Sequence, residues 1–319
     1  MGKIQTTQVY DSFWNFAYKR QEAFFNRLDN KPAPWSDDPI IQKFKFTNAY
    51  RAIDRVSQYL IKNVIYSSKI YSGDDIAFRI LLFKFFNKIE TWEYLENIFG
   101  EITYSKFDQE KFGNALDELI YKKEKIYSAA YIMPSGVSSF GFNKKHRNNL
   151  ALIDFIMRDK LPLKIAQSKS LEELYKSLLE YPMLGSFLAF QYSIDLNYSE
   201  LCDFSEMSFV VAGPGAKSGI DKCFKAVSNN YEYFIRYVAD CQEEEFKKRG
   251  LDFKTLFGRP LQLIDCQNLF CETDKYSRVL YPKVSSKQSR TRIKQLFKPK
   301  KDKIELFLPP KWGLMTHKE

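Results

Sequence analysis

Polar side chains of the kinds that carry acid–base chemistry are concentrated in the stretch PLQLIDCQNLFCETDKYSR, residues 260–278. Asp265, Asn268 and Glu272 are three and four positions apart, so on a helix they project from one side, and Lys275 continues that side one turn later. Carboxylates with an amide and a lysine on one face suit the stabilisation of a cationic transition state or the activation of water. The alternative is an amphipathic surface helix that carries ion pairs, which is the commoner fate of such charges.

A second polar group lies in PWSDDPIIQKFKFTNAYRAIDRV, residues 34–56. If a helix starts near the middle of this stretch, Asn48, Arg51 and either Asp54 or Arg55 fall on one side of it. A guanidinium group binds two oxygens of a phosphate or carboxylate at once. The pattern therefore predicts an anion clamp next to an amide.

A third group is embedded in GSFLAFQYSIDLNYSE, residues 185–200, where Gln191, Asp195 and Asn197 have apolar neighbours. Polar groups inside such a helix must find partners or be used in chemistry, and both outcomes are common. This group is thus either a second candidate site or a buried structural network.

The stretch VVAGPGAKSGIDKCF, residues 210–224, resembles a phosphate-binding loop at first sight. A Walker A loop requires a glycine immediately before the Lys-Ser pair and another five positions earlier. Here Ala216 precedes Lys217, and Val211 occupies the earlier position, so both glycines are missing. No alternation of strands and helices surrounds the stretch, and the pattern of a nucleotide-binding sheet is absent.

A helix-hairpin-helix motif fits the same stretch better. In that motif two glycines form the turn, here Gly213 and Gly215, and a small residue four positions later, here Gly219, lets the second helix pack closely. Positive φ angles at the turn would point backbone N–H groups at a DNA phosphate, and Lys217 and Lys222 would add charge. The alternative is an ordinary tight turn between two core helices.

The positive charge of the chain is concentrated near its C-terminus. The formal net charge is +10, and nine basic residues against one acid lie between residues 283 and 303. The nine are Lys283, Lys287, Arg290, Arg292, Lys294, Lys298, Lys300, Lys301 and Lys303. Such a run suits a polyanion, and we expect Arg278, Arg290 and Arg292 to contact DNA. A solvated tail that only aids solubility is the alternative.

Helical periodicity dominates the 319 residues and predicts an all-α fold. Apolar stripes or caps mark residues 11–28, 47–66, 73–87, 91–100, 108–127, 150–159, 170–181 and 183–196. We expect one helical, glycosylase-like body over residues 1–282, with the hairpin at about 199–227, and a basic extension over residues 283–319.

The cysteine and histidine content gives no metal or cofactor site. Five cysteines without a C-x-x-C pair and two histidines make no recognisable zinc or iron–sulfur ligand set. Unpaired spacing without a signal peptide predicts reduced thiols in the cytoplasm. No apolar run is long enough to cross a membrane, so no membrane partner is expected.

Several motifs together resemble a known family. PWSDDPII, FTNAYRxxDR, GxFLAFQYxIDLNYS, GPGAxxGI and FCETDKY are similar to the α-glutamyl/putrescinyl-thymine pyrophosphorylases and to the helical domain of 5-hydroxymethyluracil DNA kinases. The resemblance runs from about Phe13 to Arg278. It implies membership of the helix-hairpin-helix DNA glycosylases, some of which excise modified bases in phage defence. It also implies a catalytic aspartate, carried onto Asp265. An inserted stretch at 230–250 leaves Asp195 as the rival.

The resemblance leads to a DNA glycosylase as the first hypothesis. The enzyme would flip a hydroxymethylated or glycosylated pyrimidine out of double-stranded phage DNA, in the cytoplasm near the nucleoid. Asp265 would stabilise the sugar cation, Lys275 would form a Schiff base in a bifunctional enzyme, and base and substrate contacts would come from six side chains. These are Asn48, Arg51, Gln191, Asn268 and Glu272, and Arg55 is the sixth residue expected to contact the substrate.

Two other hypotheses remain open. One is a transferase that replaces a pyrophosphate on 5-hydroxymethyluracil in DNA with an amine or amino acid, with Arg51, Arg55 and Lys275 holding the pyrophosphate. The other is a non-catalytic DNA-binding module. The kinase activity of the larger relatives is not expected, because no kinase domain is visible in the sequence.

Overall fold

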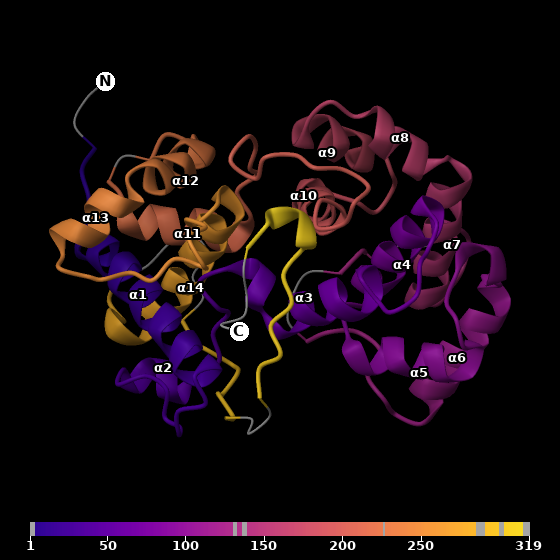
Figure 1. The fold of residues 1–319 in the computed structure, drawn as a ribbon, viewed down its shortest axis with the longest axis horizontal. Helices are drawn as coiled ribbons and strands as arrows, with labels where there is room; N and C mark the ends of the chain where they lie inside the picture. Colours follow the sequence, from indigo (N-terminus) through magenta and orange to yellow (C-terminus); the bar gives the residue numbers. More distant parts are fainter. Residues whose placement is uncertain are drawn as a thin grey trace. The chain divides into compact units, whose positions relative to one another are not determined.

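The chain is all-α, as the periodicity predicts. The computed structural model describes residues 4–129, 133–135, 139–225, 227–284, 291–299 and 303–314. In these residues every regular element is a helix, and the only β-structure is three isolated antiparallel bridges (Figure 1). Within the same residues, no helix combines the length and the apolar character that a membrane span needs. The prediction of the fold class is confirmed.

The chain divides into two compact units. Unit 1 comprises residues 1–54, 210–306 and 314–319, and unit 2 comprises residues 55–209 and 307–313. The chain therefore begins in unit 1, builds unit 2, and returns to unit 1. The expected division into a helical body over residues 1–282 and a basic extension over residues 283–319 stays a prediction.

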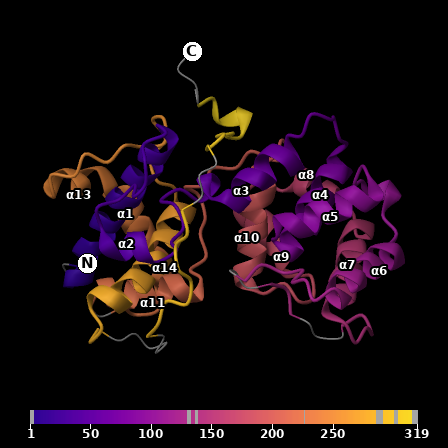
Figure 2. The same cartoon turned by 90° about the horizontal axis from the view of Figure 1, so that it is seen from below.

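Unit 1 is built around its last long helix. Its helices are α1 (Gln8–Leu28), α2 (Pro39–Lys43), η1 (Arg51–Ile53), α11 (Pro214–Cys223), α12 (Tyr231–Asp240), α13 (Gln242–Lys248) and α14 (Leu263–Leu280). Figures 1 and 2 both show α1 and α11 beside α14. The rings of Phe13 on α1 and Phe270 on α14 are 4.5 Å apart, and Phe224 completes the cluster. Residues from the two ends of the chain thus share one core.

Helices α11 and α14 pack backbone against backbone. A Cβ atom on Gly219 would lie 2.0 Å from the carbonyl oxygen of Phe270, and one on Gly215 would lie 2.3 Å from the Sγ of Cys271. Both glycines are one helical turn apart and face α14. They permit a close approach that any side chain would prevent.

The predicted hairpin differs from this arrangement. Gly213 is the N-cap of α11 with φ −71°, so the turn has no left-handed glycine. Residues 201–213 contain turns and no helix, and the first helix of the hairpin is therefore missing. Gly215 and Gly219 lie against α14 instead of forming a turn. The spacing of the glycines therefore reflects the close packing of two helices.

A buried charged network lies beneath α11. The Nζ of Lys222, which is 3% exposed, is 2.9 Å from the Oδ1 of Asp274 and 3.1 Å from the Oγ of Ser277. Ser218 donates to the same carboxylate oxygen at 2.8 Å. Because this ammonium faces α14, the predicted contact of Lys222 with a DNA phosphate has no support.

The predicted helix over residues 47–66 is broken. The backbone of Asp54 is extended, and a single 3-10 turn, η1, precedes it. The side chain of Asp54 accepts the backbone N–H of Asn48 at 2.7 Å, which favours a turn over a continuous helix. Helix α3 (Arg55–Tyr59) and the π-helix η2 (Leu60–Ile65) follow in unit 2.

Unit 2 surrounds the helix α4 (Gly73–Phe86), which is buried on all sides from Ala77 to its end. Its other helices are α5 (Ile89–Phe99), η3 (Tyr104–Lys106), α6 (Gln109–Tyr121), α7 (Lys145–Arg158), α8 (Leu161–Gln167), α9 (Leu171–Leu179), α10 (Ser186–Leu196) and η4 (Pro310–Trp312). Arg79 within α4 is fully buried and donates to the carbonyl groups of Asn63, Val64 and Ile102 at 2.9–3.2 Å. A charge in the core is therefore compensated by two carbonyl groups of η2 and by one between α5 and η3.

Candidate functional site

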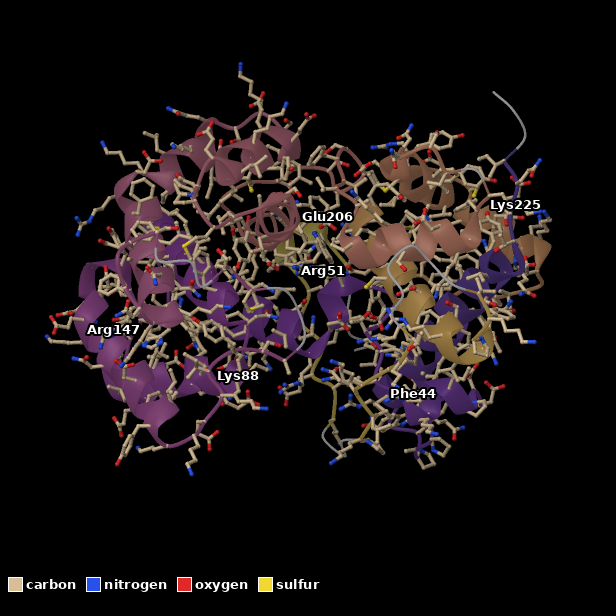
Figure 3. The ribbon with its side chains drawn as sticks, turned by 180° about the vertical axis from the view of Figure 1, so that it is seen from behind. Phe44, Arg51, Lys88, Arg147, Glu206 and Lys225 are labelled. Atoms are coloured by element: carbon tan, nitrogen blue, oxygen red, sulfur yellow. The ribbon has the colours of Figure 1, made fainter. Side chains whose placement is uncertain are left out.

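Unit 1 brings two of the predicted polar groups together. The backbone N–H of Thr47 donates to the Oε2 of Glu272 at 3.1 Å, and that of Arg51 donates to the Oδ1 of Asp265 at 2.7 Å. The segment from Thr47 to Arg51 is thus fixed on α14, although more than 200 positions separate them in the sequence. This arrangement is the candidate functional site (Figure 3 labels Arg51).

Asp265 holds backbone groups with both of its carboxylate oxygens. Its Oδ2 accepts the N–H of Gln262 at 3.0 Å, and the two residues form a capping box at the start of α14. Its Oδ1 accepts from Arg51, and the side chain is 4% exposed. Asp265 therefore stabilises the N-terminus of α14 and fixes the neighbouring segment.

Replacing Asp265 with alanine is expected to lower the free energy of unfolding by about 2 kcal/mol, because two buried N–H groups lose their acceptor. Urea denaturation measures this loss. Asp108→Ala is the matched control, since Asp108 caps the exposed start of α6 with two backbone hydrogen bonds. Equal losses in the two variants would contradict the buried role of Asp265.

Lys275 lies at the edge of the site. Its Nζ is 2.8 Å from the Oε2 of Glu272, 3.1 Å from the carbonyl oxygen of Lys45 and 5.0 Å from the ring centre of Phe46. The side chain is 24% exposed. Asn268, two turns earlier on α14, is also partly exposed. An ammonium group in this position offers positive charge to an anion that approaches from solvent.

Two further side chains, Arg20 and Asp54, complete the site. The Nη2 of Arg20 donates to the Oδ1 of Asn48 at 2.6 Å, and its Nε donates to the carbonyl oxygen of Thr47 at 2.9 Å. The amide Nδ2 of Asn48 donates to the carbonyl oxygen of Ile53 at 2.8 Å. The amide of Asn48 thus already has partners on both sides, and it positions the chain around Asp54.

Asp54 is the group in this site that is suited to proton transfer. Burial, with a smaller contribution from the nearby Glu272, raises the pKa of Asp54 to about 7, although the N–H of Asn48 and the charge of Arg20 oppose the rise. Its Oδ1 accepts from Asn48, and its Oδ2 has no hydrogen-bond partner in the described part of the chain. A carboxyl group that exchanges its proton near neutral pH fits a general base or acid.

The sequence pointed only weakly to these two residues. Asp54 shares the expected face with Asn48, but nothing local indicated a perturbed pKa. Arg20 lies on α1, 28 positions before Asn48, and only the fold brings them together. The signal for Arg20 in the sequence is its place on the apolar face of α1, between Phe16 and Phe24.

Three predicted site residues belong to unit 2. Asp195 on α10 is completely buried, and its Oδ2 is 3.3 Å from the Nζ of Lys84. Gln191 is buried one turn earlier on the same helix. Arg55 is exposed, with its Nη1 3.9 Å from the Oε1 of Glu90. The structure thus gives Asp195 a structural ion pair, and the roles proposed for Gln191 and Arg55 stay predictions.

The predicted DNA contacts have different surroundings. Arg278 donates to the carbonyl oxygen of Arg292 at 3.2 Å, and Arg292 itself is exposed. The Nζ of Lys217 lies 5.3 Å from the ring centre of Tyr231. Arg290 lies outside the described residues. The contacts of these side chains with DNA stay predictions.

Unit 2 also has a pocket of about 780 Å³. It is lined by residues from the C-terminal part of α6 to the start of α7, among them Tyr127, Lys145 and His146. None of the predicted site residues lines it. Over the described ranges of the chain, no three His, Cys, Asp or Glu side chains are grouped to hold a metal ion.

Comparisons with known proteins point to one family. Residues 7–286 match the family model described as "5-hmdU DNA kinase, helical domain". A 5-hmdU DNA kinase of Bacillus phage SP10 is 26% identical over 293 residues, which cover 84% of this chain and 45% of that protein. The chain thus spans less than half the length of this relative. No solved structure matches the chain significantly.

These findings correct the first functional hypothesis. The family match and the relative indicate DNA modification, and the prediction of a hydrolytic DNA N-glycosylase is wrong. The expected roles in phage defence and base excision lose their support with it. Both carboxylate oxygens of Asp265, the expected catalytic residue, hold backbone N–H groups, and a catalytic role for it stays a prediction.

Proposed function

Because the chain belongs to the family of 5-hmdU DNA kinase helical domains, we propose that it acts on DNA containing 5-hydroxymethyluracil and modifies that base by group transfer. The match over residues 7–286 carries this proposal, since it includes every segment of the candidate site. The relative is a DNA kinase by name, but the chain spans 45% of it. Residues of α14 occupy the space beside the glycines of α11, which argues against a phosphate-binding loop there.

The proposed reaction is the replacement of a pyrophosphate on the 5-methylene carbon by an amine or amino acid. The nitrogen lone pair forms a C–N bond, the C–O bond breaks, and its electrons leave with the pyrophosphate. Asp54 accepts the proton that the nitrogen loses. Lys275, partly exposed at the edge of the same site, offers positive charge to the leaving pyrophosphate.

The pKa of Asp54, raised to about 7 by burial, supports the role of proton acceptor. A base is most effective when its pKa lies near the working pH, because it is then both available and basic. The backbone N–H of Asn48 holds the Oδ1 of the carboxylate in place, and Arg20 in turn holds the side chain of Asn48. The Oδ2 side is the one proposed to face the nitrogen.

Nucleoside mass spectrometry tests the proposal. Duplexes containing thymine, 5-hydroxymethyluracil or its pyrophosphate ester are incubated with the protein and with putrescine or glutamate, then digested. We expect a base that carries the amine, and free pyrophosphate, with the pyrophosphorylated duplex alone. A parallel reaction with ATP on the 5-hydroxymethyluracil duplex tests for phosphorylation of the base. Binding of DNA without any new base in either reaction would contradict the proposal and favour a binding module.

A further inference from the structure

The basic C-terminal segment is paired with a second basic segment near α2. The N–H of Lys45 donates to the carbonyl oxygen of Gln295 at 3.0 Å, and the N–H of Phe297 donates to that of Lys43 at 3.0 Å. These bonds flank an antiparallel bridge at Phe44, which Figure 3 labels. We call residues 43–46 and 292–298 together the basic ribbon. It is part of unit 1, so this stretch of the predicted extension is not a free tail.

The basic ribbon has exposed positive charge without compensation. Its five cations are Lys43, Lys45, Arg292, Lys294 and Lys298, and all five are exposed. In the described part of the chain, none of them forms an ion pair with a carboxylate. Exposed lysines elsewhere, such as Lys122 and Lys176, are paired with glutamates at 2.5 Å and 2.8 Å. The ribbon is therefore a concentrated cationic surface that attracts a polyanion.

Contacts with the rest of unit 1 hold the basic ribbon in place. The ring of Phe297 lies 6.2 Å from that of Trp35, and Arg278 on α14 donates to the carbonyl oxygen of Arg292. The Nζ of Lys275 donates to the carbonyl oxygen of Lys45. The ribbon is consequently tied to the same helix that carries Glu272 of the candidate site.

The spacing of the cations suits a nucleic-acid backbone. The backbone of Phe44 is extended, so the residues on either side of it, Lys43 at the end of α2 and Lys45, lie about 6.6 Å apart. Neighbouring phosphates of one DNA strand have a similar spacing, because the strand winds around the duplex axis as it rises about 3.4 Å per nucleotide. Two lysines two positions apart therefore match two phosphates of one strand.

We propose that the basic ribbon binds the phosphate backbone of DNA and so holds the strand beside the candidate site. The identity of the polyanion as DNA rests on the proposed function. Contacts with phosphates position a protein on DNA and carry no sequence information. The ribbon is therefore expected to bind duplexes with and without 5-hydroxymethyluracil alike.

Fluorescence anisotropy with a labelled duplex, at salt concentrations from 50 to 300 mM, tests the basic ribbon. The double variant Lys43→Gln/Lys45→Gln is expected to lose about 10-fold or more in affinity, and the slope of log K against log salt becomes less negative by about 2. Lys294→Gln/Lys298→Gln is expected to behave in the same way. Lys122→Gln/Lys176→Gln, whose lysines are exposed but paired, is the matched control and should leave the slope unchanged. All four side chains of the test variants are exposed, so the melting temperature should not change.

The outcomes separate the ribbon from the proposed function. If the ribbon variants bind DNA with the wild-type salt slope, the proposal that the ribbon binds DNA is wrong, even if the wild-type protein modifies DNA. A different result is a wild-type protein that modifies no base, together with ribbon variants that bind DNA more weakly and with a less negative salt slope. This result would support DNA binding by the ribbon and contradict the proposed transferase activity. Absence of any DNA binding by the wild-type protein would overturn the ribbon.

Discussion

Replacing Gly219 with alanine is expected to lower the free energy of unfolding by about 3 kcal/mol or more. The new Cβ atom would lie 2.0 Å from the carbonyl oxygen and 2.7 Å from the carbonyl carbon of Phe270, which are backbone atoms that cannot rotate away. Helices α11 and α14 must therefore separate. Alanine is a better helix former than glycine by about 1 kcal/mol, so a net loss isolates the clash. Urea denaturation followed by circular dichroism measures it.

Two further glycine variants sharpen this test. Gly185→Ala is the control, because a Cβ atom there meets nothing within 4 Å, and stability should be nearly unchanged. Gly215→Ala is expected to be partly rescued by Cys271→Ala, since the obstacle is a side-chain sulfur at 2.3 Å. No such rescue exists for Gly219. A Gly219→Ala protein as stable as the wild type would show that α11 and α14 do not approach closely.

The second large effect is expected for Asp54→Asn, which should slow the proposed transfer reaction about 100-fold or more. Asparagine keeps an oxygen that accepts the N–H of Asn48, so the local fold is preserved, but it cannot take a proton. The affinity for DNA should stay within about twofold of the wild type. Single-turnover rates by nucleoside mass spectrometry, with anisotropy for binding, measure both. Asp37→Asn is the control, because Asp37 is 85% exposed.

The pH dependence gives a second readout of Asp54. The wild-type rate is expected to rise with pH and level off above about pH 7, as the carboxyl group loses its proton. The Asn variant should lack this rise. A full rate in the variant, or an unchanged pH profile, would remove Asp54 from the chemistry.

Stability should respond to pH in the opposite direction. The pKa of Asp54 is raised to about 7 in the folded protein, so between its ordinary value and pH 7 the folded state binds more protons than the unfolded state. The contribution of Asp54 to stability is present at low pH and is lost as the pH rises through 7. Asp54→Asn should therefore gain about 1 kcal/mol relative to the wild type at pH 8, because the group is partly exposed and the full shift does not apply.

Local patterns in the sequence predict the helices well and their packing poorly. The expected helix at 11–28 is α1, and the polar stretch at 260–278 is α14. The glycines of residues 213–219 were assigned to a phosphate, because spacing alone does not show which partner fills the space above a glycine. That partner is the backbone of Phe270, about 50 positions later.

The candidate site shows the same limit. The types of Asp265 and Asn48 suggest chemistry, but the sequence does not show that Asp265 accepts the N–H of the distant Arg51 or that Asn48 donates to the nearby carbonyl group of Ile53. Asp54 has the more suitable pKa because the fold buries it beside Glu272. Burial depends on contacts between segments that are far apart in the sequence, so it cannot be predicted from the local pattern around Asp54.

The division of the chain has a consequence during synthesis on the ribosome. Unit 1 needs residues 1–54 together with residues from 210 onward, whereas unit 2 is almost complete once residue 209 has been made. At about 5–20 residues per second, α1 waits roughly 10–40 s before α11 and α14 exist. During that time the apolar face of α1, with Phe13, Trp14 and Phe16, has no native partner, so nascent chains that end before residue 210 are expected to bind holding chaperones through it.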